Sequence, residues 1–379
     1  MKESQQLHLI AFNIPFPANY GGVIDVFYKI KALHELGVEI HLHCFEYGRT
    51  ESDVLLMYCK TVHYYKRKTG LLQQFSFKPY ITNTRFSAQL LENLTKINAP
   101  ILFEGLHCCY YLNHPDLKND VKIVRIHNVE WEYYLHLAQL ERQWIKKTYF
   151  LIESFRLKKY QSIIKYANQI IAISPQDEQK LIAQFPNQPI KYIPAFHPNE
   201  TIKSQVGAGD YILFHGDLSV KDNEAGAIYL IEEVFKNGKI PMPLVIAGLN
   251  PSARLIQLAE KIPHVTIKAN LSHEDLQNLI CKAHINILIS FQSAGMKLKL
   301  LNALFTGRFC VVNTPMIKDT GLADLCIVQD NAIDTQKELQ QLCLVSFQDK
   351  DVQKRHQGLG KTFFNSYNAQ EFLSLLKEH

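Results

Sequence analysis

The 379-residue sequence lacks the features that mark several broad classes of protein. No apolar run approaches the roughly 20 residues that a membrane-spanning helix needs. The opening MKESQQLHLIAF carries charges and amides where a signal peptide needs an unbroken apolar stretch. Glycine and proline together number 32, and there is no repeat or low-complexity tract, which excludes collagen-like, linker-rich and solenoid chains. We therefore expect a folded, cytoplasmic protein.

The sequence also lacks the spacing patterns of common metal and cofactor sites. Its eight cysteines form no CxxC pair, and HCCYYLNH offers no second pair of ligands at structural-zinc spacing. No GxGxxG, GxxxxGK[ST] or GxSxG occurs, so the nicotinamide-binding, P-loop and hydrolase-elbow motifs are missing. The cysteines are expected to be reduced thiols in the core.

Net charge is confined to one segment. Residues 141–166 hold seven basic and two acidic side chains, a surplus that equals the +5 of the entire chain. A nucleic-acid-binding protein would spread its basic residues over a broad face, so we expect one local basic element instead.

Short apolar strands alternate with amphipathic helices along the chain, which predicts parallel sheets in an α/β protein. The length and the 47% hydrophobic content favour two domains. A polar segment with prolines and glycines, residues 193–210, is the best linker. We predict a first domain over 1–200 and a second over 201–360, with a last helix in 361–379 that can dock back on the first domain. The expected strands are LHLIAF, VEIHLHCF, APILFEG, VKIVRIHN, NQIIAIS, YILFHG, PLVIAG, VTIKA, INILIS and FCVVNT.

In the first domain, polar residues follow the expected strands, where parallel sheets collect their ligands. Gly21 and Gly22 can bring a phosphate or sugar close to backbone N–H groups, although they can equally serve only the turn. Another expected strand ends at His127 and Asn128, so that the His127 imidazole and the Glu130 carboxylate both lie at its carboxyl end. The alternative is a hydrogen-bonded strand-end histidine with Glu130 capping the next helix.

In the second domain, lysines lie where a helix is expected to begin. Gly295 opens this helix, and Lys297 and Lys299 in its first turn are misplaced relative to the helix dipole unless an anion is bound there. Lys221 and Asn223 follow another strand and can also contact a phosphate. In each case the alternative is a lysine exposed to solvent beside an ordinary helix cap.

The ordered set of motifs resembles one family. A glycine turn after the first strand, HNVE before an aromatic and basic helix, AISPQD, FHGDLSVKDN, VIAG and GMKLKLLNALFTGRFCVVN occur in the order found in retaining glycosyltransferases of the GT-B fold. The resemblance implies two Rossmann-like, doubly wound domains that face a cleft. It also implies a nucleotide-sugar donor bound mainly by the second domain, an acceptor bound by the first, and no metal or cofactor.

Where a motif of this sequence matches one of the family, the resemblance implies a role for individual residues. Gly21 and Gly22 resemble the glycine loop near the donor phosphates, and His127 resembles the histidine near the transferring sugar. Lys221 is a looser match to the lysine that neutralises the pyrophosphate. The remaining donor-side matches are Gly216, Asn223, Gly295, Lys297 and Lys299.

Two family glutamates eight positions apart correspond here to Ala294 and Asn302. Asn302 can still hydrogen-bond a ribose hydroxyl, whereas Ala294 cannot contact a sugar through a polar group. The usual arginine ahead of the pyrophosphate lysine is also missing.

The hypothesis that follows is transfer of a hexose, with retention, from a nucleotide diphosphate sugar to a saccharide or lipid-linked saccharide acceptor in glycan biosynthesis. Asn128 and Glu130 are assigned to the acceptor side. The alternatives are a nucleotide-sugar 2-epimerase, which uses the same architecture, and a catalytically silent sugar-binding or scaffold protein. The basic segment with its aromatics can also rest on an anionic inner membrane, or can simply pack on the first domain.

Overall fold

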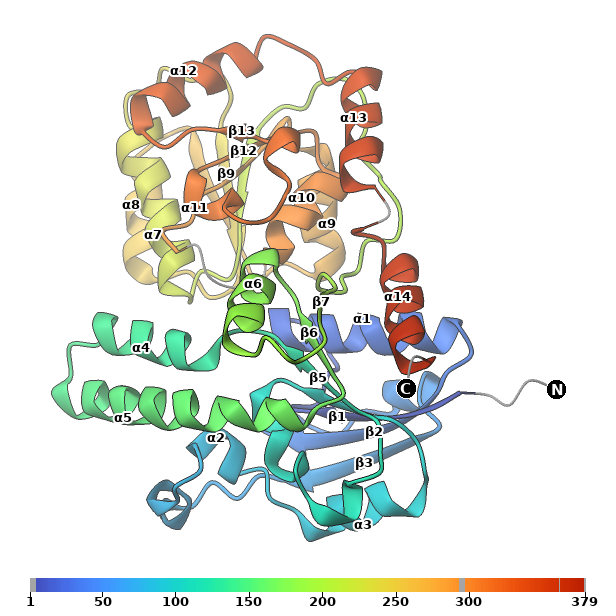
Figure 1. Ribbon diagram of the computed structural model, residues 1–379. Coiled ribbons are helices and arrows are strands. Elements are labelled where there is room, and N and C mark those ends of the chain that lie inside the picture. The colour runs from blue at the N-terminus through green and yellow to red at the C-terminus, as the bar shows by residue number, and fades with distance from the viewer. Residues whose placement is uncertain (1–4, 293–296, 361, 378–379) are drawn as a thin grey trace. The chain divides into compact units, whose positions relative to one another are not determined.

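The computed structural model describes residues 5–292, 297–360 and 362–377, which fold as two compact units (Figure 1). The first unit contains residues 5–198 and 365–377, and the second contains 199–292 and 297–364. The division after Pro198 falls inside the segment expected to be the linker. Within the described residues, no helix combines the length and the apolar character needed to cross a membrane.

The first unit is built on a seven-stranded parallel sheet in the order β3-β2-β1-β4-β5-β6-β7. Alternate residues of β1 point to opposite faces, so that Leu7 and Leu9 contact one core cluster and Ile10 contacts another. The strands are β1 (Gln6–Ala11), β2 (Glu39–Glu46), β3 (Thr61–Lys66), β4 (Ile101–Glu104), β5 (Lys122–Ile126), β6 (Gln169–Ala172) and β7 (Ile190–Tyr192).

Helices cover both faces of this sheet. The α-helices are α1 (Gly21–Glu35), α2 (Tyr80–Asn83), α3 (Ala88–Lys96), α4 (Glu130–Leu140), α5 (Trp144–Tyr160), α6 (Pro175–Gln184) and α14 (Asn365–Lys377). The 3-10 turns are η1 (Asp53–Met57), η2 (Leu71–Phe75), η3 (Leu106–Tyr111), η4 (Pro115–Leu117) and η5 (Gln161–Tyr166). Ser174 caps α6 by accepting a hydrogen bond from Asp177 N, as the Ser-Pro pair predicts.

The last helix of the chain belongs to the first unit. Figure 1 shows α14 beside α1, and Phe372 and Leu376 share a core cluster with Ile30. The chain therefore completes the second unit and then returns to cover the first sheet.

The second unit repeats the topology of the first. Its six parallel strands lie in the order β10-β9-β8-β11-β12-β13. They are β8 (Ile212–His215), β9 (Leu244–Gly248), β10 (Val265–Ala269), β11 (Ile285–Leu288), β12 (Phe309–Val312) and β13 (Ile327–Val328). The surrounding helices are α7 (Lys221–Tyr229), η6 (Leu230–Phe235), α8 (Ala253–Glu260), α9 (His273–Lys282), α10 (Leu298–Thr306), α11 (Thr314–Ile317), η7 (Ala323–Leu325), α12 (Ala332–Leu342) and α13 (Asp349–Leu359).

Each sheet reverses its strand order once, between β1 and β4 in the first unit and between β8 and β11 in the second. Doubly wound sheets bind ligands beyond the carboxyl ends of the strands at this point of reversal. The two Rossmann-like sheets predicted from the sequence are thus confirmed, and the candidate site residues are found beside both reversal points.

Candidate functional site

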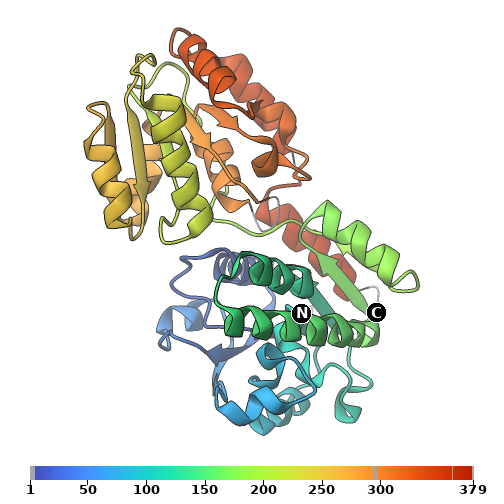
Figure 2. The same ribbon diagram turned by 90° about the vertical axis from the view of Figure 1, so that its left-hand side faces the viewer.

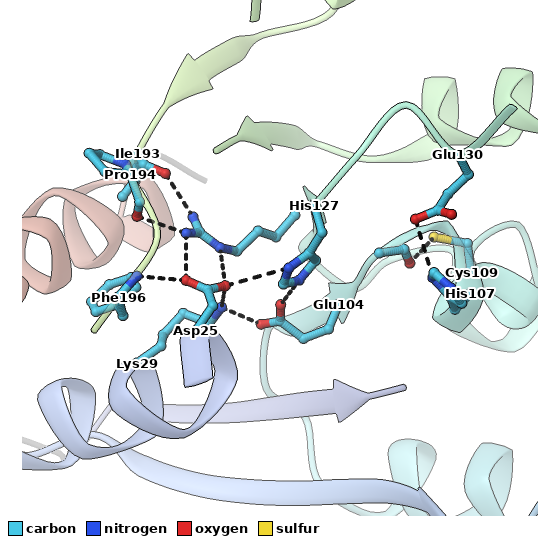
Figure 3. Close-up of polar contacts among 12 residues, drawn as sticks. Asp25, Lys29, Glu104, His107, Cys109, His127, Glu130, Ile193, Pro194 and Phe196 are labelled. Carbon is cyan, nitrogen blue, oxygen red and sulfur yellow. Dashed lines mark hydrogen bonds and ion pairs between the residues drawn. The ribbon is translucent and has the colours of Figure 1, made fainter. Parts of the chain in front are cut away.

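A buried charge network occupies the reversal point of the first sheet (Figure 3). It comprises Asp25 and Lys29 of α1, Glu104 at the end of β4, Arg125 of β5 and His127 just after β5. Asp25, Lys29, Glu104 and Arg125 expose none of their surface. Because buried ions need compensating partners, their contacts decide what this network can do.

Arg125 and Lys29 neutralise the two carboxylates. The Arg125 guanidinium donates to both Asp25 oxygens at 2.9 Å, and Lys29 Nζ lies 3.1 Å from Asp25 Oδ2 and 2.7 Å from Glu104 Oε1. Burial raises the pKa of Asp25, but Arg125, Lys29 and His127 outweigh it, so the net shift is downward. The pKa of Glu104 is also lowered, by Lys29 and His127 against the effect of burial. The positive charges of Arg125 and Lys29 therefore balance the negative charges of the two carboxylates.

Backbone groups complete the network. Arg125 donates to the carbonyl oxygens of Ile193 and Pro194 at 3.2 and 2.8 Å, and Phe196 N donates to Asp25 at 2.7 Å. The network thereby joins α1, β5 and the segment after β7. Because almost every polar group of the network has a hydrogen-bond or ion-pair partner within the unit, its role is mainly structural.

His127 is the member of the network with a nitrogen left over. Its Nε2 is 2.8 Å from Glu104 Oε2, whereas its buried Nδ1 has no hydrogen-bond partner in the described part of the chain. Asp25 Oδ2 lies 3.7 Å from this Nδ1, beyond hydrogen-bond range. The imidazole exposes 6% of its surface. Both ring nitrogens therefore face carboxylates of the network, Nε2 toward Glu104 and Nδ1 toward Asp25, and Glu104 fixes the orientation of the ring.

Oxygen and nitrogen atoms of Asp25, Glu104 and His127 all lie within 4.8 Å of one another, which is close enough to hold a metal ion. The remaining partners argue against such a site. Lys29 and Arg125 already neutralise both carboxylates, and a divalent cation beside them would face two fixed positive charges. The residues do not fit a metal centre.

A second titratable pair lies near the same edge. Glu130 is the first residue of α4 and exposes 5% of its surface, and its Oε1 is 3.8 Å from the unpartnered Nδ1 of His107. Burial raises the pKa of Glu130 to about 7, partly offset by Arg85. Burial, followed by the charge of Arg85, lowers the pKa of His107 well below its usual value. A carboxyl and a neutral imidazole thus sit together with hydrogen-bonding capacity to spare.

The other first-unit candidates have simpler surroundings. Gly21 and Gly22 are the first two residues of α1, and a Cβ on Gly22 would come within 2.6 Å of the Phe12 ring. Gly22 therefore has a packing reason to be glycine. The Phe12 ring also lies 5.5 Å from those of His107 and His127, and Asn128 is half-buried after β5.

The second unit holds a different kind of cluster, which we call the Lys299 cluster: Asp222, Asn223, Ser290 and Lys299. Lys299 Nζ donates to Asn223 Oδ1 at 2.8 Å and forms no ion pair within the described ranges. Asp222 instead accepts from Ser290 Oγ at 2.7 Å and from Phe291 N at 2.8 Å. The ammonium group therefore has a neutral partner where it would be expected to have an anionic one.

The pKa values of Lys299 and His215 are both lowered, as expected for a cluster in which no anion lies against the ammonium group. Lys299 as a whole is half-buried, yet burial lowers the pKa of its ammonium group to about 8, against a weaker opposing effect of Asp222. Burial, with help from the Lys299 charge, lowers the pKa of His215 to about 3. An anion binding beside Lys299 would stabilise its charged form.

The remaining donor-side residues are placed as follows. Helix α10 begins at Leu298, so Lys297 is its N-cap rather than part of its first turn, and its Nζ donates to Gln292 O at 2.9 Å. Lys221 is the exposed first residue of α7. Asn302 accepts from Gln277 Nε2 of α9 at 3.0 Å, so its oxygen is engaged within the unit.

Two glycine positions bear on the nucleotide side. Gly216 follows β8, and a Cβ there would lie 3.0 Å from the Asn223 amide, so a larger residue would press on the Lys299 cluster. Gly295 and Ala294 lie outside the described residues.

Sequence reasoning missed Asp25, Lys29, Arg125 and Asp222. The one available signal was charge inside apolar surroundings, since Arg125 interrupts the strand VKIVRI and Lys29 interrupts the apolar face of a helix. Asp25 and Lys29 are also four residues apart, the spacing of a helical ion pair.

Comparison with known proteins agrees with this architecture. Residues 209–343 match the family described as glycosyl transferases group 1. An uncharacterized 44.6 kDa protein in the cps region of Klebsiella pneumoniae is 24% identical over 332 residues, covering 83% of this chain and 84% of that protein.

Solved structures share the fold over the full length. Sucrose-phosphate synthase from Thermosynechococcus elongatus has a TM-score of 0.69 at 15% identity, covering 99% of this chain and 98% of that one. The UDP-forming α,α-trehalose-phosphate synthase from Burkholderia xenovorans has a TM-score of 0.61 at 10% identity, covering 98% and 100%. The chain has the GT-B fold. Residues 209–343 of this fold are the part that matches the glycosyl transferases group 1 family.

Proposed function

We propose that the protein transfers a hexose from a nucleotide diphosphate sugar to a saccharide acceptor with retention of configuration. The observation that carries this proposal is Lys299, a cation at the reversal point of the second sheet that has no carboxylate partner among the residues the structure describes. A nucleotide diphosphate supplies the missing negative charge, and the matched glycosyl transferases group 1 region contains the cluster.

The reaction needs charge stabilisation more than it needs a strong base. The bond between the anomeric carbon and the diphosphate oxygen breaks, a new bond forms to an acceptor hydroxyl oxygen, and the hydroxyl proton passes to the leaving diphosphate. Lys299 and Lys297 stabilise the negative charge that grows on the diphosphate. Because these lysines supply positive charge at the diphosphate, we propose that no metal ion or cofactor takes part.

First-unit residues contact the sugar and the acceptor in this proposal. His127 lies next to the transferring sugar in this proposal, with Glu104 and Asp25 fixing the orientation of its ring. Asn128 and the Glu130–His107 pair bind acceptor hydroxyl groups.

The relative in a cps region favours a role in cell-surface polysaccharide synthesis. We therefore propose that the acceptor is a lipid-linked saccharide and that transfer takes place on the cytoplasmic side of the membrane.

Calorimetry with nucleotide diphosphates, followed by product analysis with the matching nucleotide-sugar, tests the proposal. We expect binding of at least one nucleotide diphosphate, and a product with the anomeric configuration of the donor. Inversion would contradict retention. Release of a 2-epimer and free nucleotide without transfer would identify an epimerase, and the absence of nucleotide binding would favour a silent scaffold protein.

A further inference from the structure

Helix α5 has apolar residues on two opposite faces. At about 100° per residue, Trp144, Ile145, Leu151, Ile152 and Phe155 fall within a sector of roughly 120°. Side chains on the opposite side hold the helix in place: Ser154 donates to Trp131 O at 2.7 Å, Leu157 is in the core, and Glu153 accepts from Tyr80 N at 2.7 Å. The sector of five residues, which we call the α5 stripe, points away from this packing.

The α5 stripe is exposed to an extent unusual for such residues. Trp144, Ile145 and Phe155 expose 76%, 67% and 60% of their surfaces, and Leu151 and Ile152 expose 44% and 47%. Two more exposed aromatics are Phe75, the last residue of η2, and Phe77 just after it, and η2 is tied to α5 by a 2.9 Å hydrogen bond from Arg156 to Gln74 O. Several large apolar side chains exposed on one helix face indicate a contact with a partner or a membrane.

The charged residues around the stripe indicate which kind of partner it binds. Lys147 and Lys158 lie along one border of the stripe and Arg156 along the other, while Lys159 lies within it, 4.4 Å from the Phe155 ring. The one acidic residue in 142–160 is Glu153, which is fully buried and paired with Arg156. An apolar stripe bordered by cations fits an anionic bilayer surface.

A second copy of the same chain fits less well. A two-fold contact through the α5 stripe would bring two identical sets of lysines together, with no exposed acidic side chain in 142–160 to separate them.

We propose that the α5 stripe, with Phe75 and Phe77, is the surface through which the protein docks on anionic membranes. Figure 2 shows α5 side by side with α4, and the packing of these two helices against each other supports the stripe. The inference deepens the proposed function, since docking brings the enzyme to a lipid-linked acceptor. Docking itself does not depend on sugar transfer.

Co-sedimentation of the full chain with vesicles tests this surface. We expect binding to phosphatidylglycerol-containing vesicles at low salt, weakening with added salt, and at least tenfold weaker binding to phosphatidylcholine alone. Binding to the anionic vesicles should be at least tenfold weaker for W144S/F155S and for K147Q/K158Q/K159Q. The matched controls are I333S/L344S and K350Q/K354Q, which change equally exposed residues of the second unit and should bind as the unaltered protein does.

Tryptophan fluorescence gives an independent readout, because the chain has two tryptophans, Trp131 and Trp144, and only Trp144 lies in the stripe. Emission should shift to shorter wavelength with anionic vesicles, and W144F should abolish the shift while retaining binding. Equal binding to neutral and anionic vesicles, or equal losses in the control variants, would overturn the proposal.

Two further measurements separate the remaining outcomes. If sedimentation equilibrium shows a dimer that W144S/F155S dissociates, and vesicles do not bind, the stripe is a self-association surface and membrane docking is wrong. Nucleotide diphosphate binding by the same preparation reports on the proposed function separately, so loss of docking with intact nucleotide binding refutes docking alone.

Discussion

The two reversal points of the molecule handle buried charge in opposite ways. In the first unit, Arg125 and Lys29 balance Asp25 and Glu104 within a network closed by backbone groups. In the second unit, Lys299 rests on an asparagine oxygen while the nearby Asp222 is engaged by Ser290 and Phe291 N. A balanced network needs no ligand, whereas an unbalanced cation does. The comparison therefore separates a structural cluster from a binding site within one repeated topology.

The largest expected effect tests whether the first network is structural. R125M leaves Asp25 buried with fewer partners, and breaking a buried ion pair in this way costs about 3 to 5 kcal/mol. Urea unfolding of the first unit should show this loss. The double variant D25L/R125M removes charge of both signs and should recover part of it. Equal losses in the single and double variants would show that charge balance is not what the network provides.

His127 is the one member of the balanced network that exposes any surface, so a ligand can reach the network only there. We expect H127A to lower kcat by roughly a hundredfold or more, the scale of removing one hydrogen bond made in the transition state, with little change in donor affinity. Steady-state kinetics and nucleotide calorimetry on the same variant measure the two effects. Weaker nucleotide binding with normal turnover at saturation would instead assign His127 to the donor.

The first unit also contains a buried ionisable group whose charge is not balanced by an ion pair, the carboxyl of Glu130. Burial raises the pKa of this carboxyl to about 7, whereas in the unfolded chain it has its ordinary pKa of 4.5, so between these values the folded protein holds a proton that the unfolded chain releases. The free energy of unfolding should therefore fall as pH rises from about 4.5 to 7. E130Q removes this dependence and should stabilise the protein by about 3 kcal/mol at pH 8 and hardly at all at pH 4.5. Melting curves across this range would show whether the gain grows with pH.

Lys299 should behave in the opposite sense to Arg125. K299M removes a half-buried cation that has no carboxylate partner, so stability should stay the same or rise. Affinity for nucleotide diphosphate should fall by about 1 to 3 kcal/mol, the scale of a charge-assisted hydrogen bond. K221M, at the exposed start of α7, is the control and should bind more tightly than K299M. An unchanged dissociation constant in K299M would end the distinction between the two clusters.

The smallest expected effect is the pH dependence of binding. The pKa of Lys299 is about 8 without a ligand, so the ammonium group loses its proton as pH rises through this value. Nucleotide diphosphate affinity should therefore decline between pH 7 and 9, by up to about tenfold for one unit of pH above the pKa. The decline should be absent in K299M. Calorimetry at three pH values is sufficient to detect it.

The sequence predicted the elements that have strong local patterns. Every expected strand is present, because continuous apolar runs bounded by polar loops are typical of buried parallel strands. The strands that were missed are β3, β7 and β13, which carry polar residues or are very short. All three lie at or next to sheet edges, where burial imposes little pattern.

The site was predictable only where chemistry coincided with a strand or helix end. His127, Asn223 and Lys299 were singled out in this way, and their roles stay predictions. Arg125 could not be interpreted, because its partner Asp25 lies one hundred residues earlier and no local pattern connects them. The engagement of Asn302 by Gln277 depends likewise on the packing of α10 against α9.

The return of α14 to the first unit has a consequence for the order of synthesis. A ribosome releases the strands of the first sheet long before it makes Phe372, Leu375 and Leu376, which fill the core beside α1. The nascent first unit must therefore wait, with one wall of its core uncovered, while the entire second unit is translated. Until then, the core cluster that these three residues share with Ile30 and Leu33 of α1 is incomplete.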